Sequence, residues 1–162
     1  MKTNYHTCTM LETPHVAVGV AIATKFPNPW VSIPLALLSH VVLDKIPHWN
    51  PHLYTETKKT GHPSEKSTII ASVDIALSFI FGSAFAYRAL PDTKMALLIL
   101  ACSLASVFSD VIKYPYYYFH LRQKWLVKWV NFERSMQVDT KSIFLGLFTQ
   151  AIVIAASIWW IL

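Results

Sequence analysis

The chain has 162 residues, of which 54% are hydrophobic and only 14% charged, whereas about 25% of residues are charged in an ordinary soluble protein. Together with a mean hydropathy of +0.39, this excludes a soluble globular fold and predicts one polytopic membrane domain over residues 1–162. The net charge of +5 does not predict nucleic-acid binding, because most lysines and arginines flank apolar runs, where they face lipid headgroups. The expected partners are therefore membrane lipids.

Five apolar runs predict five transmembrane helices, because each run approaches the ~20 residues needed to cross a bilayer. Their predicted bounds are residues 14–26, 30–46, 67–90, 93–113 and 141–162. The first begins at Pro14 with Thr13 as its N-cap, and it is short for a span. Pro47 ends the second, and residues 47–66 form the longest polar connection. The predicted fold is an all-α membrane bundle.

Residues 116–132 are predicted to form an additional, amphipathic helix. Its apolar face and its polar face consist respectively of Leu121, Trp125, Trp129 and Phe132, and of Arg122, Lys124, Lys128 and Asn131. Tryptophan on one face with lysine and arginine on the other is typical of a helix that lies in the membrane interface.

His40 and Asp44 lie four residues apart, so they share one face of the second predicted span. Ionisable groups in a lipid-facing segment are costly and are functional-site candidates for that reason. The alternating direction of the helices brings His15, Asp74 and Asp110 to the same depth as this pair, and His48 follows just beyond it. Residues three or four positions from these polar groups are mostly small, as is typical of close contacts between membrane helices.

Charge asymmetry orients the bundle. The end that carries these polar groups holds 11 of the 14 basic residues, namely Lys2, Lys45, Lys58, Lys59, Lys66, Lys113, Arg122, Lys124, Lys128, Arg134 and Lys141. Because cytoplasmic loops are enriched in lysine and arginine, we expect the N-terminus and the site on the cytoplasmic side of an inner membrane.

Imidazoles and carboxylates at one depth form an N/O ligand set that suits Zn, Mn or Fe. The expected metal ligands are His15, His40, Asp44, Asp74, Asp110 and His48. Of these, Asp44 and Asp74 are also the expected catalytic residues, with Asp74 bridging two ions or acting as the general base. Such a site suits hydrolysis of a phosphate ester or a lipid-like substrate.

Two segments, residues 14–19 (PHVAVG) and 39–49 (SHVVLDKIPHW), resemble uncharacterised small bacterial membrane proteins. These are similar to membrane-bound metal-dependent hydrolases and, through the HxxxD step, distantly to zinc-dependent phospholipase C. A weaker match covers residues 108–110. The resemblance implies metal binding by His15, His40, Asp44 and Asp110, although the chain lacks the PDxDH and HRxxTHS elements of the hydrolase pattern.

Three other functions fit the same residues. The carboxylates would bind a cation in transit if the protein is a metal-ion transporter. In a non-catalytic membrane scaffold they would only fasten helices together, and residues 116–132 would recruit a partner. A haem protein would use a pair of axial histidines such as His15 and His40.

Overall fold

The computed structural model describes residues 10–49, 51–138, 140 and 142–162. Over these residues the chain is all-α, with seven helices and no strand, which confirms the all-α part of the predicted fold. The helices are α1 (Glu12–Lys25), α2 (Pro29–Leu43), α3 (Leu53–Thr60), α4 (Glu65–Arg88), α5 (Thr93–Tyr118), α6 (Lys124–Met136) and α7 (Ile143–Ile161).

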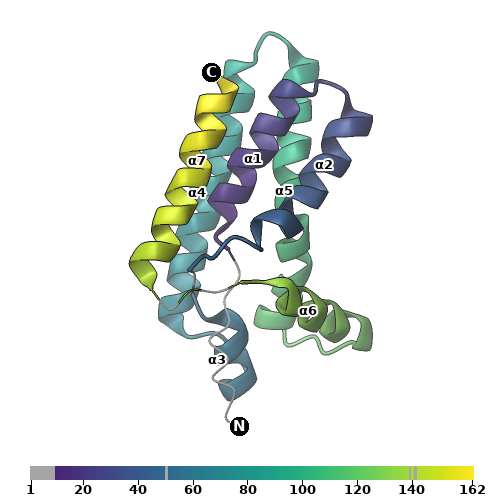
Figure 1. The fold of residues 1–162 in the computed structure, drawn as a ribbon. Helices are drawn as coiled ribbons and strands as arrows, with labels where there is room; N and C mark the ends of the chain where they lie inside the picture. Colours follow the sequence, from purple (N-terminus) through teal and green to yellow (C-terminus); the bar gives the residue numbers. More distant parts are fainter. Residues whose placement is uncertain (1–9, 50, 139, 141) are drawn as a thin grey trace.

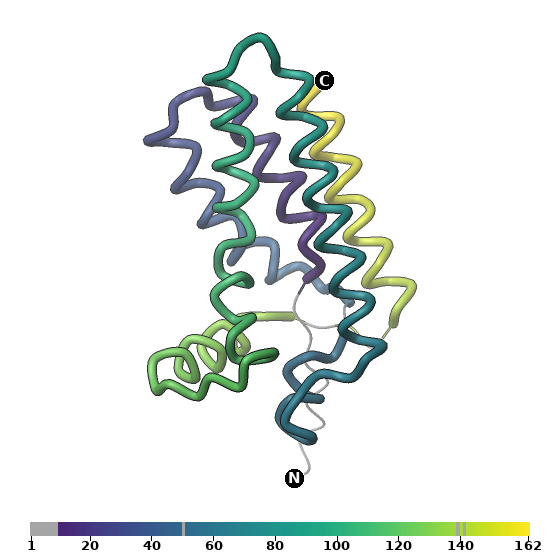
Figure 2. Tube along the Cα trace, turned by 180° about the vertical axis from the view of Figure 1, so that it is seen from behind, coloured from purple at the N-terminus to yellow at the C-terminus, as the bar shows by residue number. Residues whose placement is uncertain are grey.

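The five longer apolar helices form an up-and-down bundle. Helices α1, α4 and α7 run from the end that carries α3 and α6 toward the end where the C-terminus lies, and α2 and α5 run back (Figure 1). We call these the α6 end and the C-terminal end. Seen from behind, the left-to-right order is reversed while the neighbours stay the same, and α6 lies beside the end of α5 (Figure 2).

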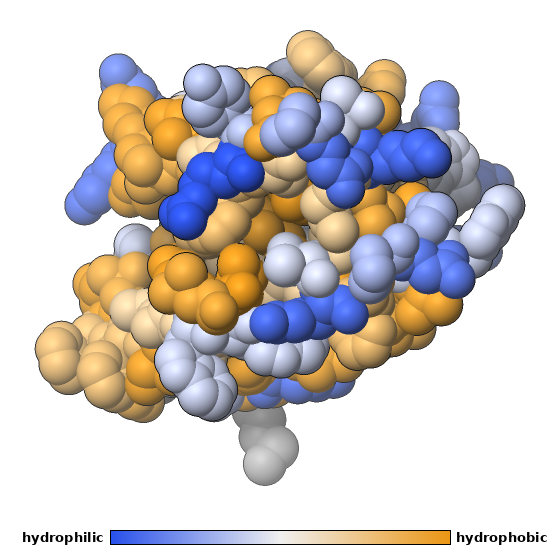
Figure 3. Space-filling model, turned by 90° about the horizontal axis from the view of Figure 1, so that it is seen from above, coloured by the Kyte–Doolittle hydropathy of each residue, from blue (hydrophilic) through white to orange (hydrophobic). Residues whose placement is uncertain are grey.

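Three of these helices, α4, α5 and α7, are long and apolar enough to cross a membrane. Their outward side chains are largely exposed hydrophobic groups, such as Phe79 at 73%, Leu97 at 67% and Phe144 at 80%. Seen from above, hydrophobic residues reach much of the outer edge, with hydrophilic residues scattered between them (Figure 3). Monomeric soluble proteins rarely expose so much contiguous apolar surface, whereas a lipid-facing surface requires it.

Helix α1 lies inside the bundle, packed against α2, α4, α5 and α7. Its 14 residues span about 21 Å at 1.5 Å per residue, less than the ~30 Å of a bilayer core. Small residues allow the neighbours to approach it closely. A side chain at Gly19 would place its Cβ 2.7 Å from the carbonyl oxygen of Cys102 on α5.

The start of α1 is capped by other helices. Thr13, the predicted N-cap, lies inside the helix, and the N-cap position is occupied by Leu11, whose side chain makes no capping bond. Instead, the Asp74 carboxylate on α4 accepts hydrogen bonds from the backbone N–H groups of Glu12 (2.5 Å) and Thr13 (3.3 Å). The Gln150 side chain on α7 accepts from the backbone N–H of Leu11. These long-range contacts fix where α1 begins.

Further differences from the prediction concern α5, the polar connection after Pro47 and the amphipathic helix. Helix α5 continues through Pro115 to Tyr118 instead of ending at Lys113, because the bundle packs Tyr116 and Tyr117, which are 3% and 4% exposed, against α6. The polar connection after Pro47 contains α3. The predicted amphipathic helix begins at Lys124 and reaches Met136, four residues beyond its predicted end.

Candidate metal centre

The site lies near the α6 end of the bundle, where four helices meet. Helix α2 contributes His40 near its C-terminus and Asp44 just after it, and α1 contributes His15. Helix α5 brings Asp110 and Lys113, and α6 brings Glu133. All six residues are buried, with exposed fractions of 6% or less.

His40 is the centre of the cluster. Its Nδ1 lies 2.9 Å from the backbone carbonyl oxygen of Ser106, which can only accept, so Nδ1 carries a proton and donates it. The other ring nitrogen, Nε2, faces three carboxylates: Glu133 at 3.1 Å, Asp44 at 3.6 Å and Asp110 at 3.8 Å. Ser106 lies on α5, so this hydrogen bond holds the ring with Nε2 toward the three acids. In metal sites, a hydrogen bond from the other ring nitrogen orients a histidine ligand in the same way.

His15 stacks on His40, with ring centroids 4.2 Å apart and ring planes 20° from parallel. Its Nε2 lies 3.6 Å from Asp44 Oδ1, and among the described residues neither of its ring nitrogens has a hydrogen-bond partner. His15 is 0% exposed. A buried polar group without a partner costs free energy and requires an explanation.

Lys113 and Glu133 complete the cluster, and neither is among the predicted site residues. The Lys113 ammonium pairs with Asp110 and also with Glu133, in the second case at 2.5 Å. Lys113 was predicted to be an interfacial lysine, whereas it is 2% exposed. Its position three residues after Asp110 was the available signal. For Glu133 the signal was its spacing from Leu126 and Val130, which form the buried face of α6.

Backbone pairing holds the segment after α6 against the segment after α2. The carbonyl oxygen of Asp44 accepts from Val138 N–H at 2.9 Å, and the backbones of His48 and Thr140 pair at 3.1 Å. The Gln137 side chain donates to Asp44 Oδ2 at 3.1 Å. These bonds join the two segments that present Asp44 and Glu133.

Two carboxyl groups of the cluster, those of Asp44 and Glu133, lie outside the candidate membrane spans and outside α2, and both have a lowered pKa. For Glu133, burial raises the pKa, but the hydrogen bond to His40 and the charge of Lys113 outweigh burial and lower it from 4.5 to about 2. For Asp44, burial also raises the pKa, and the contact with His15 and the nearby charges of His40 and Lys113 lower it well below its ordinary value. Both groups are therefore carboxylates at neutral pH and favour a positive partner.

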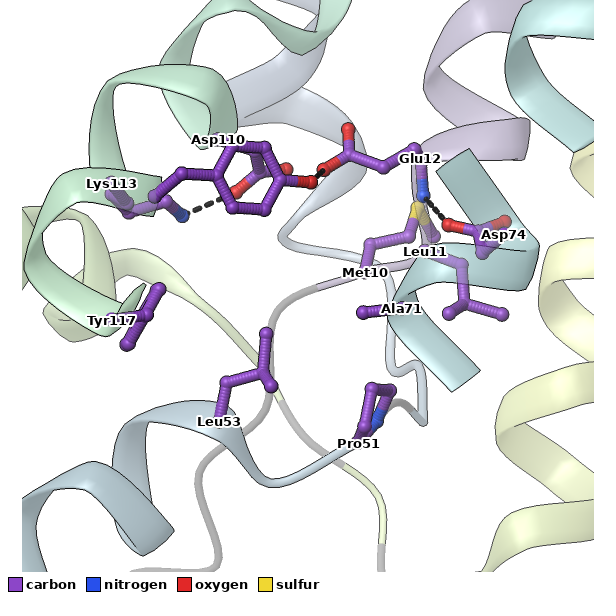
Figure 4. A pocket seen from close by; sticks show the side chains of 11 residues that line it. Met10, Leu11, Glu12, Pro51, Leu53, Ala71, Asp74, Asp110, Lys113 and Tyr117 are labelled. Carbon is purple, nitrogen blue, oxygen red and sulfur yellow. Dashed lines mark hydrogen bonds and ion pairs between the residues drawn. The ribbon is translucent and has the colours of Figure 1, made fainter. Parts of the chain in front are cut away.

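Asp74 and Glu12 form a separate polar group beside the cluster (Figure 4). Both Asp74 oxygens accept from the start of α1, because Thr13 donates its hydroxyl to Oδ1 at 2.6 Å in addition to the backbone bonds. Tyr114 donates to Glu12 Oε1 at 3.2 Å. Glu12 and Asp74 line a cavity of about 30 Å³ together with Asp110 and Lys113, which is about the volume of one water molecule.

The structure therefore brings four of the six expected ligands together, His15, His40, Asp44 and Asp110. Asp74 is occupied as the cap of α1. His48 is 0% exposed, and its Nδ1–H donates to the Ile46 carbonyl oxygen at 2.7 Å.

Two groups of side chains could hold a metal ion within the described part of the chain. One comprises His15, His40 and Asp110, and the other His40, Asp44 and Glu133. Both include His40, whose Nδ1 is already bonded to Ser106. One nitrogen lone pair binds one ion, so the two groups describe overlapping ligand sets around Nε2. Imidazole and carboxylate donors of this kind fit Zn, Mn or Fe.

Comparison of the chain with protein-family models, with curated proteins and with solved structures gives no match. Fold and site together define the class: a helical protein with three candidate membrane spans and buried clusters of histidine, aspartate and glutamate.

Proposed function

We propose that the protein is a membrane-embedded, metal-dependent hydrolase that acts on a phosphate ester or a lipid-like substrate from the cytoplasmic leaflet. The observation that carries this proposal is the convergence of three carboxylates on His40 Nε2, at 3.1 to 3.8 Å, beside the His15 ring, whose nitrogens have no hydrogen-bond partner among the described residues. A fold gains no stability from buried donors and acceptors that lack partners, whereas a bound cation would satisfy them.

In this proposal His40 holds the ion together with His15 and Asp110 from one group and with Asp44 and Glu133 from the other. A divalent ion supplies Lewis-acid polarisation of a phosphoryl oxygen and activates water for attack. The Ser106 carbonyl keeps His40 in the tautomer that leaves Nε2 free to bind. The cavity beside Asp110 has room for about one water molecule, the second reactant of a hydrolysis.

The proposed site lies at one surface of the bilayer. Helices α1 and α2 would complete five crossings, and α6 would lie in the interface. Its exposed Trp125 and Phe132 lie on one flank of the buried face, and the exposed Lys124 and Lys128 lie opposite that face. Among the described residues the α6 end carries eight exposed or half-buried basic residues, Lys45, Lys58, Lys59, Lys66, Arg122, Lys124, Lys128 and Arg134. The C-terminal end carries three, Lys25, Arg88 and Lys94. Lys2 and Lys141 lie outside the described residues. This asymmetry favours a cytoplasmic α6 end.

Hydrolysis is favoured over transport by the composition of the other half of the bundle. A transported cation needs polar groups along its whole path. The buried side chains between the cluster and the C-terminal end are mostly small and aliphatic, such as Val20, Ala36 and Ile99. The buried hydroxyls of Ser32 and Ser103 donate to carbonyl groups of their own helices and do not face a path.

The test combines metal content with turnover. The protein is purified in detergent and incubated with Zn²⁺ or Mn²⁺, and bound metal and cleavage of bis(p-nitrophenyl) phosphate are measured for the wild type, His40→Ala and Asp44→Ala. We expect stoichiometric metal and chelator-sensitive turnover in the wild type, and loss of both in the two variants. His62→Ala, at an exposed loop histidine, is the matched control and should retain both.

Metal binding without turnover of any phosphate ester would contradict the hydrolase. A wild-type protein that binds no metal would remove the basis of the proposal altogether.

A further inference from the structure

Asp110 and Glu133 each turn their two carboxylate oxygens toward two different positive partners. Asp110 Oδ2 lies 3.8 Å from His40 Nε2, while Oδ1 pairs with the Lys113 ammonium. Glu133 does the same, with Oε1 3.1 Å from His40 Nε2 and Oε2 2.5 Å from Lys113 Nζ. Both carboxylates therefore reach from a point beside His40 to a second point occupied by Lys113.

Two carboxylates that each join the same two positive centres are arranged like the bridging ligands between the paired ions of a two-ion hydrolytic site. In this chain the second position is filled from within. Lys113 lies three residues after Asp110 on α5, and its side chain is almost completely buried.

The charges of the cluster balance with one divalent ion and not with two. Asp44, Asp110 and Glu133 contribute −3 and Lys113 contributes +1, so the sum with neutral histidines is −2. One divalent ion brings this sum to 0, and a second would bring it to +2. Uncompensated charge in a buried site is strongly unfavourable, so the lysine and a single ion form the balanced set.

We propose that the metal centre is a one-ion site and that the Lys113 ammonium is its built-in second cation. The inference rests on the metal site of the proposed function and specifies it further. It predicts one ion per chain in the wild type and a second ion once the lysine is removed, because two bridging carboxylate oxygens then face a vacated position.

The experiment uses the full chain in detergent, saturated with Mn²⁺ and freed of unbound metal. Manganese per chain is measured by mass spectrometry, and electron paramagnetic resonance distinguishes an isolated ion from a spin-coupled pair. We expect one ion with a six-line spectrum in the wild type. We expect two ions with a spin-coupled spectrum in Lys113→Ala. Lys128→Ala, at an exposed lysine of α6, is the matched control and should keep one ion.

Two ions in the wild type, or one ion in Lys113→Ala, would overturn the inference while leaving the metal site itself intact. No ion in either protein would instead overturn the proposed function, and the inference with it. Lys113→Gln, which keeps a hydrogen-bonding side chain, carries the same expectation if the alanine variant does not fold. The wild-type ratio and spectrum decide against the inference on their own if they show a pair.

Discussion

The two ends of the bundle satisfy their buried polar groups in different ways. Toward the C-terminal end, Ser103 donates to the Ile99 carbonyl and Thr24 to the Val20 carbonyl, each within its own helix. At the α6 end the polar groups come from four helices and face one another, with several atoms left without hydrogen-bond partners among the described residues. A hydroxyl that donates to a carbonyl group of its own helix has its hydrogen bond already, and its small side chain lets neighbouring helices pack closely. Ionisable groups that face one another between helices are costly by themselves, so they indicate a site.

Acid should weaken the α6 end first, and this is the largest effect we expect. The pKa of Glu133 is lowered from 4.5 to about 2, so its stabilising contribution is complete above pH 4.5 and is lost as the pH falls toward 2. The full loss is on the order of 3 kcal/mol, because one pKa unit corresponds to about 1.4 kcal/mol. The measurement is the free energy of unfolding of chelator-treated protein in detergent between pH 7 and pH 2.

Glu133→Gln should remove this part of the pH dependence, because the amide does not titrate in this range. Glu65→Gln, at an exposed position at the start of α4, should leave the profile unchanged. A Glu133→Gln profile as steep as that of the wild type would show that Glu133 does not carry the acid sensitivity.

The second prediction concerns the close packing of α1 against α5 at Gly19. At Gly19 an added Cβ would lie 2.7 Å from the Cys102 carbonyl oxygen and 2.8 Å from Ser106 Oγ. Gly19→Val should therefore push α1 away from α5 and lower the free energy of unfolding by about 1–3 kcal/mol, as overpacking does. Because the Ser106 carbonyl holds His40, metal affinity should fall as well.

Thermal unfolding in detergent and a metal titration measure the two effects. The control is Ala155→Val on the exposed face of α7, which introduces the same side chain at an exposed position. Equal stability of the two variants would contradict the close contact between α1 and α5.

The difference between the two ends also explains what the sequence could predict. Composition and hydropathy predicted the all-α fold, and the three longest apolar helices were recognisable by length alone. The pairing of His40 with Asp44 followed from their spacing on one helix. Each of these features depends on residues close together in the sequence, so it can be predicted from one segment alone.

The remaining features of the site depend on contacts between segments that are far apart in the sequence. Glu133 joins the cluster only because α6 turns the face with Leu126 and Val130 toward α5. In the sequence, the face with the tryptophans was more conspicuous, so the buried face was not predicted. Asp74 was predicted to be a ligand, and its contact with the first N–H groups of α1 is one that no local pattern of α4 indicates. Lysines near the ends of apolar runs usually lie at the membrane surface, so Lys113 was counted among them.

The smallest predicted effect belongs to Asp92, a carboxylate at the C-terminal end. It is the N-cap of α5, where its side chain accepts from the backbone N–H of Met95 at 3.0 Å, and it is exposed. Asp92→Ala should lower the free energy of unfolding by about 1 kcal/mol, the usual effect of losing a cap, and should leave bound metal unchanged.

Asp110→Ala, on the same helix, should abolish or weaken metal binding, because the buried oxygen beside His40 is removed. The free energy of unfolding in detergent and the metal content are measured for both variants. They test whether metal binding depends on the acid in the cluster and not on the acid at the other end of α5. Loss of metal in Asp92→Ala would show that the two ends are linked and that the cluster depends on the stability of the whole helix.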